Sequence, residues 1–327
     1  MPRSAPACRL MRALLAALLL PATLTAEAQA QTPAQPLIKL VVPYPAGGIT
    51  DQVARLLVEK MAQQLGQVVI IDNRPGAAGR IGIDAVVKAP ADGTTLLLTN
   101  SSYSILPVIE AKAGYDPLKS MVPLGMVATY GLGIVTSLQT PVTTLQQFID
   151  HARKNPGKLS YGSSGPGSGS HFAGEYFKAL TGTYLVHIPY RSTSAALNDV
   201  AGGILDLSFD ASIKPLVDAG KVRLLAVTSE QRDPRFPNVP TATEAGLKGY
   251  VQMSWVGLLA SAGTPAATVE RLNQAAARAA ADPAVHKGLL DMGLQPASVG
   301  RHEHAQMIRQ ELALYARIAA DAKLKFD

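Results

Sequence analysis

The sequence is poor in cysteine: Cys8 is the only one among 327 residues. Cys8 precedes the apolar run of residues 10–24, whereas a lipid-modified cysteine would follow such a run, so we expect no lipid anchor. The chain beyond this segment has no cysteine at all, which excludes a disulfide framework. A chain of this length can instead bury enough apolar surface for two domains.

Aromatic residues are also scarce, at 5% of the chain, and the basic residues are scattered rather than clustered. Nucleic-acid-binding domains concentrate lysine and arginine on one face and add aromatic platforms for bases. We therefore expect no nucleic-acid partner. The formal net charge of +6 can attract small anions, and solubility explains it equally well.

The N-terminus has the pattern of a secretory signal peptide. Arg3, Arg9 and Arg12 lie before or at the start of the apolar run, and Ala-Glu-Ala and Ala-Gln-Ala follow it as small-residue cleavage sites. The run is too short for a membrane-spanning helix. We expect residues 1–30 to be removed, which takes away three arginines and one glutamate and lowers the net charge from +6 to +4.

Short β-rich runs alternate with helical stretches along the rest of the chain, which predicts an α/β fold with mostly parallel sheets flanked by helices. The predicted strands are 37–42, 68–71, 94–99, 131–136, 185–189, 204–209, 222–228 and 251–260. The predicted helices between them are 51–65, 145–154, 171–180 and 194–200. Helices at 264–280, 282–293 and 301–323 predict a C-terminal helical layer without a strand.

Loops rich in glycine, serine or threonine follow several predicted strands, at 43–48, 100–102, 161–171 and 191–194. Ligands of α/β sheets bind beyond the carboxyl ends of the strands, where helix N-termini favour anions. Glycine lets the backbone approach a ligand, and serine adds a hydroxyl donor. These loops predict a concave site for a small anion, although each one alone is also compatible with an ordinary turn. Residues 73–79 form either a structural turn or a rim of the pocket.

Motifs for common enzyme classes are absent. The sequence has no P-loop and no nucleophile elbow, and Ser170 stands where a dinucleotide-binding fingerprint needs its third glycine. His302 and His304 do not have the spacing of a zinc site. We expect no metal, no cofactor and no catalytic residue. The alternative is a secreted serine hydrolase that uses the Gly/Ser loop with His171.

Seven stretches together resemble one family, the periplasmic substrate-binding receptors of the tripartite tricarboxylate transporters, also called the Bug type. They occur in the family's order over nearly the whole chain after residue 30. The stretches are PYPAGGITDQVARL, IDNRPGAAGRIGIDAVVKAPADGTTLLL, YDPLKSMVPLGMVA, YGSSGPGSGSHFAGEYFKALTG, HIPYRSTSAALNDVAGGILDLSFD, VRLLAVTSEQRDPRFPNVPTATEAG and WVGLLASAGTP.

This resemblance implies a two-lobed fold of the periplasmic binding protein type that closes around its ligand by a hinge motion. We expect lobe 1 to comprise residues 37–134 and 256–327, and lobe 2 residues 135–255. The segments in which the chain crosses from one lobe to the other are then 131–136 and 253–258. Trp255, the only tryptophan, lies in the second of them.

The resemblance also implies that the loops hold a ligand carboxylate. The residues that match the family's first loop are Tyr44, Ala46, Gly47, Gly48 and Asp51. The residues that match its Gly/Ser loop are Ser163, Ser164, Gly167, Ser168 and His171. Side contacts would come from Asn100, Ser101 and Ser102.

The loop after Pro189 departs from the family pattern. Many relatives resemble PYKGGAPAL there, whereas this chain has PYRSTSAAL. Arg191, Ser192 and Thr193 offer more donors, and arginine can hold a carboxylate through two parallel hydrogen bonds. We predict a second anionic or strongly polar ligand group at this loop, unless Arg191 faces solvent. Asp210 is either an ordinary strand-end carboxylate or a partner for a ligand amine.

The resemblance implies a non-catalytic receptor in the periplasm that delivers a small carboxylate to membrane transporter subunits. A variant of this function presents the ligand to a membrane sensor. We expect a monomer. Tricarboxylates, dicarboxylates, amino acids and aromatic acids all fit the predicted site.

Overall fold

The computed structural model describes residues 37–110, 113–321 and 323. The expected signal peptide at 1–30 and Cys8 lie outside the described residues. Pro36–Asp327 form one compact unit, and the description below concerns its described part.

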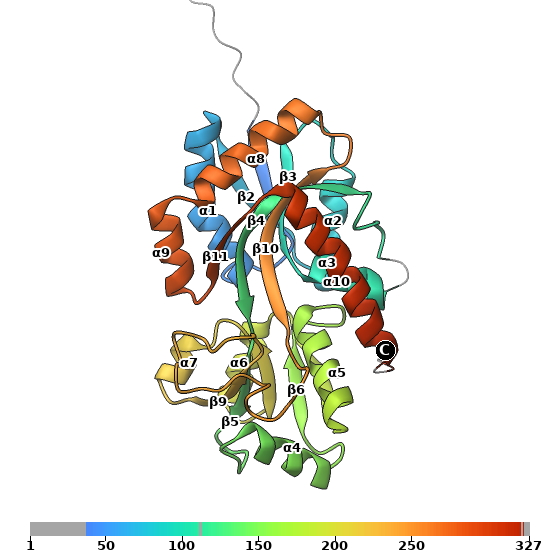
Figure 1. Cartoon of the computed structure of the whole chain (residues 1–327), viewed down its shortest axis with the longest axis vertical. Coiled ribbons are helices and arrows are strands. Elements are labelled where there is room, and N and C mark those ends of the chain that lie inside the picture. Colours follow the sequence, from blue (N-terminus) through green and yellow to red (C-terminus); the bar gives the residue numbers. More distant parts are fainter. Residues whose placement is uncertain (1–36, 111–112, 322, 324–327) are drawn as a thin grey trace, which may run out of the picture. The chain divides into compact units, whose positions relative to one another are not determined.

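The larger of two sheets has six strands in the order β11-β4-β10-β3-β1-β2 (Figure 1). The strands are β1 (Ile38–Val42), β2 (Val69–Asn73), β3 (Thr95–Asn100), β4 (Met121–Gly131), β10 (Met253–Ser261) and β11 (Gln295–Val299). Alternate residues of one strand point to opposite faces. Leu96 and Leu98 accordingly belong to one hydrophobic cluster, and Leu97 belongs to another.

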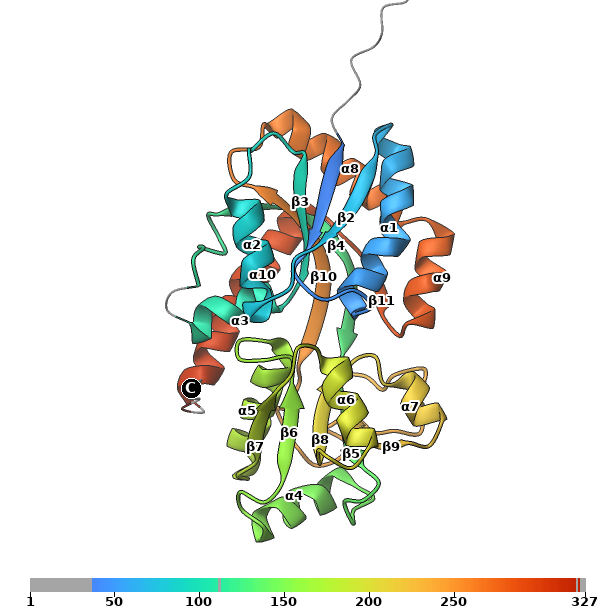
Figure 2. The same cartoon turned by 180° about the vertical axis from the view of Figure 1, so that it is seen from behind.

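Helices cover both faces of this sheet (Figures 1 and 2). One face packs against α1 (Ile49–Leu65), α8 (Ala266–Ala280) and α9 (Pro283–Asp291). The other packs against α2 (Arg80–Val87), α3 (Ser102–Ile109) and α10 (Arg301–Asp321). The strands are therefore buried on both sides, which explains why they read as nearly continuous apolar runs.

The smaller sheet has five strands in the order β7-β6-β8-β5-β9. They are β5 (Gly133–Ser137), β6 (Ser160–Ser163), β7 (Val186–Pro189), β8 (Leu207–Asp210) and β9 (Val222–Val227). Its helices are α4 (Leu145–Lys154), α5 (Gly169–Thr181), α6 (Thr193–Ala201) and α7 (Lys214–Asp218). Phe177 of α5 and Phe209 of β8 pack together with ring centroids 5.8 Å apart.

The chain passes from the larger sheet to the smaller between Gly131 and Gly133, and it returns where β10 begins at Met253. Thr228 joins both passages. Its Oγ1 accepts a hydrogen bond from Leu132 N–H at 2.8 Å and donates one to the Gln252 carbonyl at 2.6 Å. The division into lobes at 134/135 and 255/256 stays a prediction.

The predicted α/β fold, with helix-flanked sheets and helices near the C-terminus, is confirmed by these elements. Two details were wrong. The sheets are mixed rather than mostly parallel, since four of the nine pairings between described strands are parallel. The C-terminal layer also contains a strand, because β11 lies between α9 and α10 and pairs with β4.

Candidate functional site

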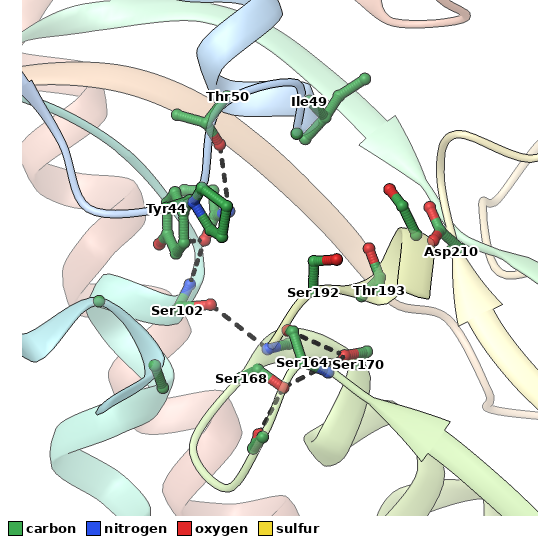
Figure 3. A pocket seen from close by; sticks show the side chains of 18 of the residues that line it. Tyr44, Ile49, Thr50, Ser102, Ser164, Ser168, Ser170, Ser192, Thr193 and Asp210 are labelled. Atoms are coloured by element: carbon green, nitrogen blue, oxygen red, sulfur yellow. Dashed lines mark hydrogen bonds between the residues drawn. The ribbon is translucent and has the colours of Figure 1, made fainter. Parts of the chain in front are cut away.

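A cavity of about 710 Å³ opens where loops of the two sheets face each other (Figure 3). Its wall includes the loops that follow β1, β2 and β3 of the larger sheet and those that follow β6, β7 and β8 of the smaller sheet. The carboxyl ends of six strands thus converge on one space, and four of the six loops are those that the compositions singled out.

Most of the residues that the sequence singled out line this cavity. They are Tyr44, Ala46, Gly47, Gly48, Asn100, Ser101, Ser102, Ser164, Ser168, Arg191, Ser192, Thr193 and Asp210. Asp51, Ser163, Gly167 and His171 lie behind the wall rather than in it. Whether any of them contacts a ligand stays a prediction.

The first loop ends at an unusual helix start. Helix α1 begins at Ile49, two residues before the predicted start at 51. Its N-cap is Gly48, and no side chain of the described residues caps it. Gly48, Ile49 and Thr50 all line the cavity. The first N–H groups of an α-helix have no partner within the helix and carry the positive end of its dipole. The uncapped, electropositive N-terminus of α1 therefore lies at the wall of the cavity.

Asp51 supports this loop from behind. Its carboxylate accepts hydrogen bonds from Gly47 N–H at 2.8 Å, from Arg55 Nε at 2.9 Å and from Asn73 Nδ2 at 3.0 Å. Burial alone would raise the pKa of Asp51, but these donors outweigh it and lower the pKa. The sequence predicted Asp51 as a ligand contact. In the structure, Asp51 holds Gly47 and the loop around it, which line the cavity.

Tyr44 fixes the loop after β3. Its hydroxyl donates to Asn100 Oδ1 at 2.8 Å, and the same oxygen accepts from Ser102 N–H at 2.9 Å. Burial raises the pKa of Tyr44, so the hydroxyl stays protonated at neutral pH. The loop therefore presents fixed, uncharged donors to the cavity.

The Gly/Ser loop is held by its own hydroxyls. Ser168 caps α5 by accepting from His171 N–H at 3.2 Å, and it donates to the Gly165 carbonyl at 2.7 Å. Ser170 Oγ accepts from Ser164 N–H at 3.0 Å. Ser102, from the opposite sheet, accepts from Gly169 N–H at 3.3 Å (Figure 3). The loop is thus ordered, and one hydrogen bond joins it to the facing loop.

His171 packs beneath this loop. Its Nδ1 accepts from Gly167 N–H at 3.3 Å. His187 Nε2 lies 2.6 Å from Ser163 Oγ, which in turn accepts from Gly165 N–H at 3.0 Å. Neither Ser163 nor His187 lines the cavity. These imidazoles therefore contact the loop from the side away from the cavity.

The loop after β7 leads into α6, whose N-cap is Ser192. Ser192 Oγ accepts from Ala195 N–H at 3.2 Å. Among the described residues that line the cavity, Arg191 is the only basic one and Asp210 is the only acidic one. The wall is otherwise built from neutral donors and apolar surface.

Several wall residues were not expected from the sequence. Leu132 and Gln252 come from the passages between the sheets, Tyr130 comes from the end of β4, and Ile105 comes from α3. The predicted crossing segment 131–136 contains Leu132, and Tyr130 and Gln252 each precede a predicted crossing segment by one residue, so these segments were the available signal. Pro75 to Gly79 also line the cavity, so this segment shapes the rim.

Within the described ranges, no group of three or more His, Cys, Asp or Glu side chains is placed to hold a metal ion. The described helices also include none with the length and apolarity needed to cross a bilayer.

Two helix-flanked sheets with a ligand-sized cavity between their strand-end loops define a solute-binding protein of the periplasmic type. A family model described as the tripartite tricarboxylate transporter family receptor matches residues 53–324. The chain belongs to this family. The resemblance expected from the seven sequence stretches is thereby confirmed.

Related chains agree over most of their length. A UPF0065 protein from the tcbD–tcbE intergenic region of Pseudomonas sp. strain P51 is 36% identical over 295 residues, covering 89% of this chain and 88% of that one. Protein BugT of Bordetella pertussis is 33% identical over 303 residues, covering 90% and 91%.

Solved structures share the fold. The periplasmic binding protein BugD has a TM-score of 0.84 and 32% identity, covering 88% of this chain and 98% of its own. R. palustris Rpa4515, solved with adipate, has a TM-score of 0.84 and 33% identity over the same shares. MatC from Rhodopseudomonas palustris, with bound malate, has a TM-score of 0.82 and 30% identity, covering 86% and 98%.

Proposed function

We propose that this protein is a non-catalytic receptor that captures a small carboxylate in the cavity and delivers it to a tripartite tricarboxylate-type membrane transporter. The observation that carries the proposal is the uncapped N-terminus of α1, which opens on a cavity rich in hydroxyls. A buried carboxylate needs many hydrogen bonds to replace its water, and this wall offers them. Two proteins with the same fold and 30–33% identity, Rpa4515 and MatC, were solved with adipate and with malate.

The neutral donors suit a receptor that must also release its ligand. An ion-paired trap would bind a carboxylate more tightly and for longer, whereas hydrogen bonds from N–H and O–H groups leave dissociation accessible. The residues we propose as contacts on the larger-sheet side are Gly48 and Ser102, and those on the smaller-sheet side are Ser164, Ser168 and Thr193.

The first test is thermal melting of the protein against a panel of carboxylates, after it has been unfolded and refolded to remove bound ligand. A ligand at one hundred times its dissociation constant stabilises the fold by about 2.7 kcal/mol, which raises the melting temperature. The proposal expects at least one acid to do so and to be recovered unchanged. If no carboxylate raises the midpoint, the proposal is wrong.

The hydrolase alternative predicts a different result in the same assay. A serine hydrolase would consume an ester or amide, and Ser168→Ala or His171→Ala would abolish turnover. In a receptor, the same variants only weaken binding, because Ser168 caps α5 and His171 supports the loop.

Delivery to a transporter requires export and closure. We propose cleavage of the signal peptide near residue 30, which N-terminal sequencing of the protein from a periplasmic extract would test. We also propose that the two lobes, 37–134 with 256–327 and 135–255, close around the ligand. Small-angle scattering should then give a smaller radius of gyration with ligand. Uptake of the identified acid should stop when the receptor gene is deleted; continued uptake would argue for a sensor as the partner.

A further inference from the structure

Asp210 is a buried carboxyl group in the cavity wall that lacks a full set of partners. It ends β8 and is 2% exposed. Its Oδ1 accepts a hydrogen bond from Ser212 N–H at 2.7 Å. Its Oδ2 is buried and has no hydrogen-bond partner in the part of the chain that the structure describes. Buried polar atoms are nearly always paired in folded proteins, so this oxygen calls for an explanation.

No lysine or arginine among the described residues forms an ion pair with Asp210. Burial raises the pKa of its carboxyl group, and nearby donors, led by Ser212 N–H, offset this rise only in part. Burying a carboxylate without a cation is costly, and a protein normally pairs such a charge. Asp210 is therefore a buried acceptor in the cavity wall for which the described chain supplies no cation.

The position of Asp210 indicates where that cation would come from. The residue lines the cavity, and Figure 3 shows it beside Thr193, on the side of β8 and α6. Thr50 and Tyr44, near the start of α1, lie apart from it in the same view. A ligand that places its carboxylate at α1 can thus extend a second, donating group toward Asp210.

We propose that Asp210 pairs with an ammonium group of the ligand, so that the cargo is an amino carboxylate rather than a plain carboxylate. This inference rests on the proposed function, because it assumes that the cavity is the binding site. An ammonium group both donates to Oδ2 and supplies the missing charge, whereas a hydroxyl donates without neutralising the carboxylate. The ligand therefore carries at least one anionic and one cationic group.

The test compares acids that share a skeleton and differ at one substituent. Succinate, malate and aspartate carry hydrogen, hydroxyl and ammonium at the same carbon, and glutarate and glutamate form a second matched pair. Other α-amino acids and their deaminated analogues extend the panel. Isothermal titration at pH 7.5 is done with the parent protein, with Asp210→Asn and with Asp218→Asn. Asp218, on α7, has a side chain 54% exposed and controls for the loss of one negative charge.

The parent should bind at least one amino acid more tightly than its deaminated analogue. Asp210→Asn should raise the dissociation constant of that amino acid roughly 10- to 100-fold, the size of a lost charge-assisted hydrogen bond. The same variant should leave the deaminated acid unchanged or slightly tighter. Asn keeps the acceptor for Ser212 N–H, so the turn after β8 is retained. Asp218→Asn should bind every acid as the parent does.

Two results would overturn the inference and leave the proposed function intact. One is that plain carboxylates bind and no amino acid binds better than its analogue, a comparison that needs only the parent protein. The other is that Asp210→Asn weakens both members of a pair equally. If no carboxylate of any kind binds, the proposed function fails and the inference fails with it.

Discussion

The imidazole rings of His171 and His187 stack with their centroids 4.2 Å apart and their planes 19° from parallel. One ring comes from α5 and the other from β7, and both support the Gly/Ser loop. Burial lowers the pKa of His171 to about 4, with a further lowering by His187 and Lys178 and an opposing rise from Glu175. Burial also lowers the pKa of His187. The loop is thus held by two neutral imidazoles.

Acid should therefore destabilise the protein before its carboxylates protonate. The pKa of His171 is about 4 in the folded chain and about 6.5 in an unfolded one. The unfolded state thus binds the extra proton, and the stabilisation is complete above pH 6.5 and lost as the pH falls toward 4. His171→Phe keeps a ring in the stack and cannot be protonated. Urea unfolding at pH 7.5 and 5.0 measures the free energy of unfolding. Between these two pH values, His171→Phe should lose about 2 kcal/mol less of this free energy than the parent does.

His302→Gln is the matched control, because His302 is exposed on α10 and should leave the pH dependence unchanged. An identical pH dependence in His171→Phe and the parent would show that the stacked pair does not titrate in this range.

Glu311 should affect the pH dependence of stability in the opposite direction to His171. Burial raises its pKa to about 7, although Trp255 Nε1 donates to it at 2.8 Å and Ser101 Oγ at 3.4 Å. A carboxyl group with a raised pKa stabilises the fold below its ordinary pKa of 4.5, and this contribution is lost as the pH rises through 7. Glu311→Gln should raise the free energy of unfolding above pH 7 by up to about 3 kcal/mol, with no gain near pH 4.5.

Trp255 provides a second readout, since its indole N–H contacts Glu311 and it is the only tryptophan. Its fluorescence should titrate near pH 7 in the parent and stay flat in Glu311→Gln. Glu303→Gln, exposed on the same helix, is the control. A fluorescence titration that survives in Glu311→Gln would assign the transition to another group.

Gly167→Ala should loosen the Gly/Ser loop. Gly167 has φ +86°, and a Cβ there would lie 2.7 Å from Leu106 Cδ1 and 3.2 Å from Ala78 Cβ. A left-handed conformation costs an L-residue about 1–2 kcal/mol. We expect a loss of stability of that size and weaker binding of the carboxylate found by melting. Gly202→Ala is the control, since its φ of −79° suits alanine. Equal melting temperatures of the two variants would contradict the prediction.

Arg191→Ala should change selectivity rather than stability. Arg191 is exposed at the edge of the cavity and has a guanidinium that can hold a carboxylate through two hydrogen bonds. If it meets a second ligand carboxylate, the variant should weaken dicarboxylates roughly tenfold more than monocarboxylates. Titrating both kinds of acid into parent and variant measures this. An equal loss of affinity for both kinds of acid, or no loss, would contradict the prediction of a second ligand carboxylate at Arg191.

The sequence predicted the fold well where apolar runs were unbroken, as in β1, β3 and β9. It missed β4, which contains Pro123 and Gly125, and it missed β11, which is short and contains Pro296. Proline and glycine lower the strand signal, so pairing partners far along the chain decide these cases. Two of the five antiparallel pairings between described strands, β10 with β4 and β11 with β4, involve the strands that were missed.

At the site, composition located the loops but not the direction of each side chain. Asp51 turns back onto Gly47 N–H and His171 packs under Gly167, so both lie behind the wall. Such orientations follow from hydrogen bonds within each loop, which residue types alone do not specify. The sequence did not indicate Gly48 as the N-cap of α1 either, because Thr50 and Asp51, which follow it, are residue types that cap helices more often.

The hydroxyl of Thr228 joins the two passages between the sheets at one point, through Leu132 N–H and the Gln252 carbonyl. Other contacts join the two halves elsewhere: Gly169 N–H donates to Ser102 Oγ at 3.3 Å, and the ring centroids of Phe172 and Tyr315 lie 5.0 Å apart. If the two halves open as proposed, these contacts must break, whereas those of Thr228 can persist. The cost of opening then falls on the Gly/Ser loop and on α5.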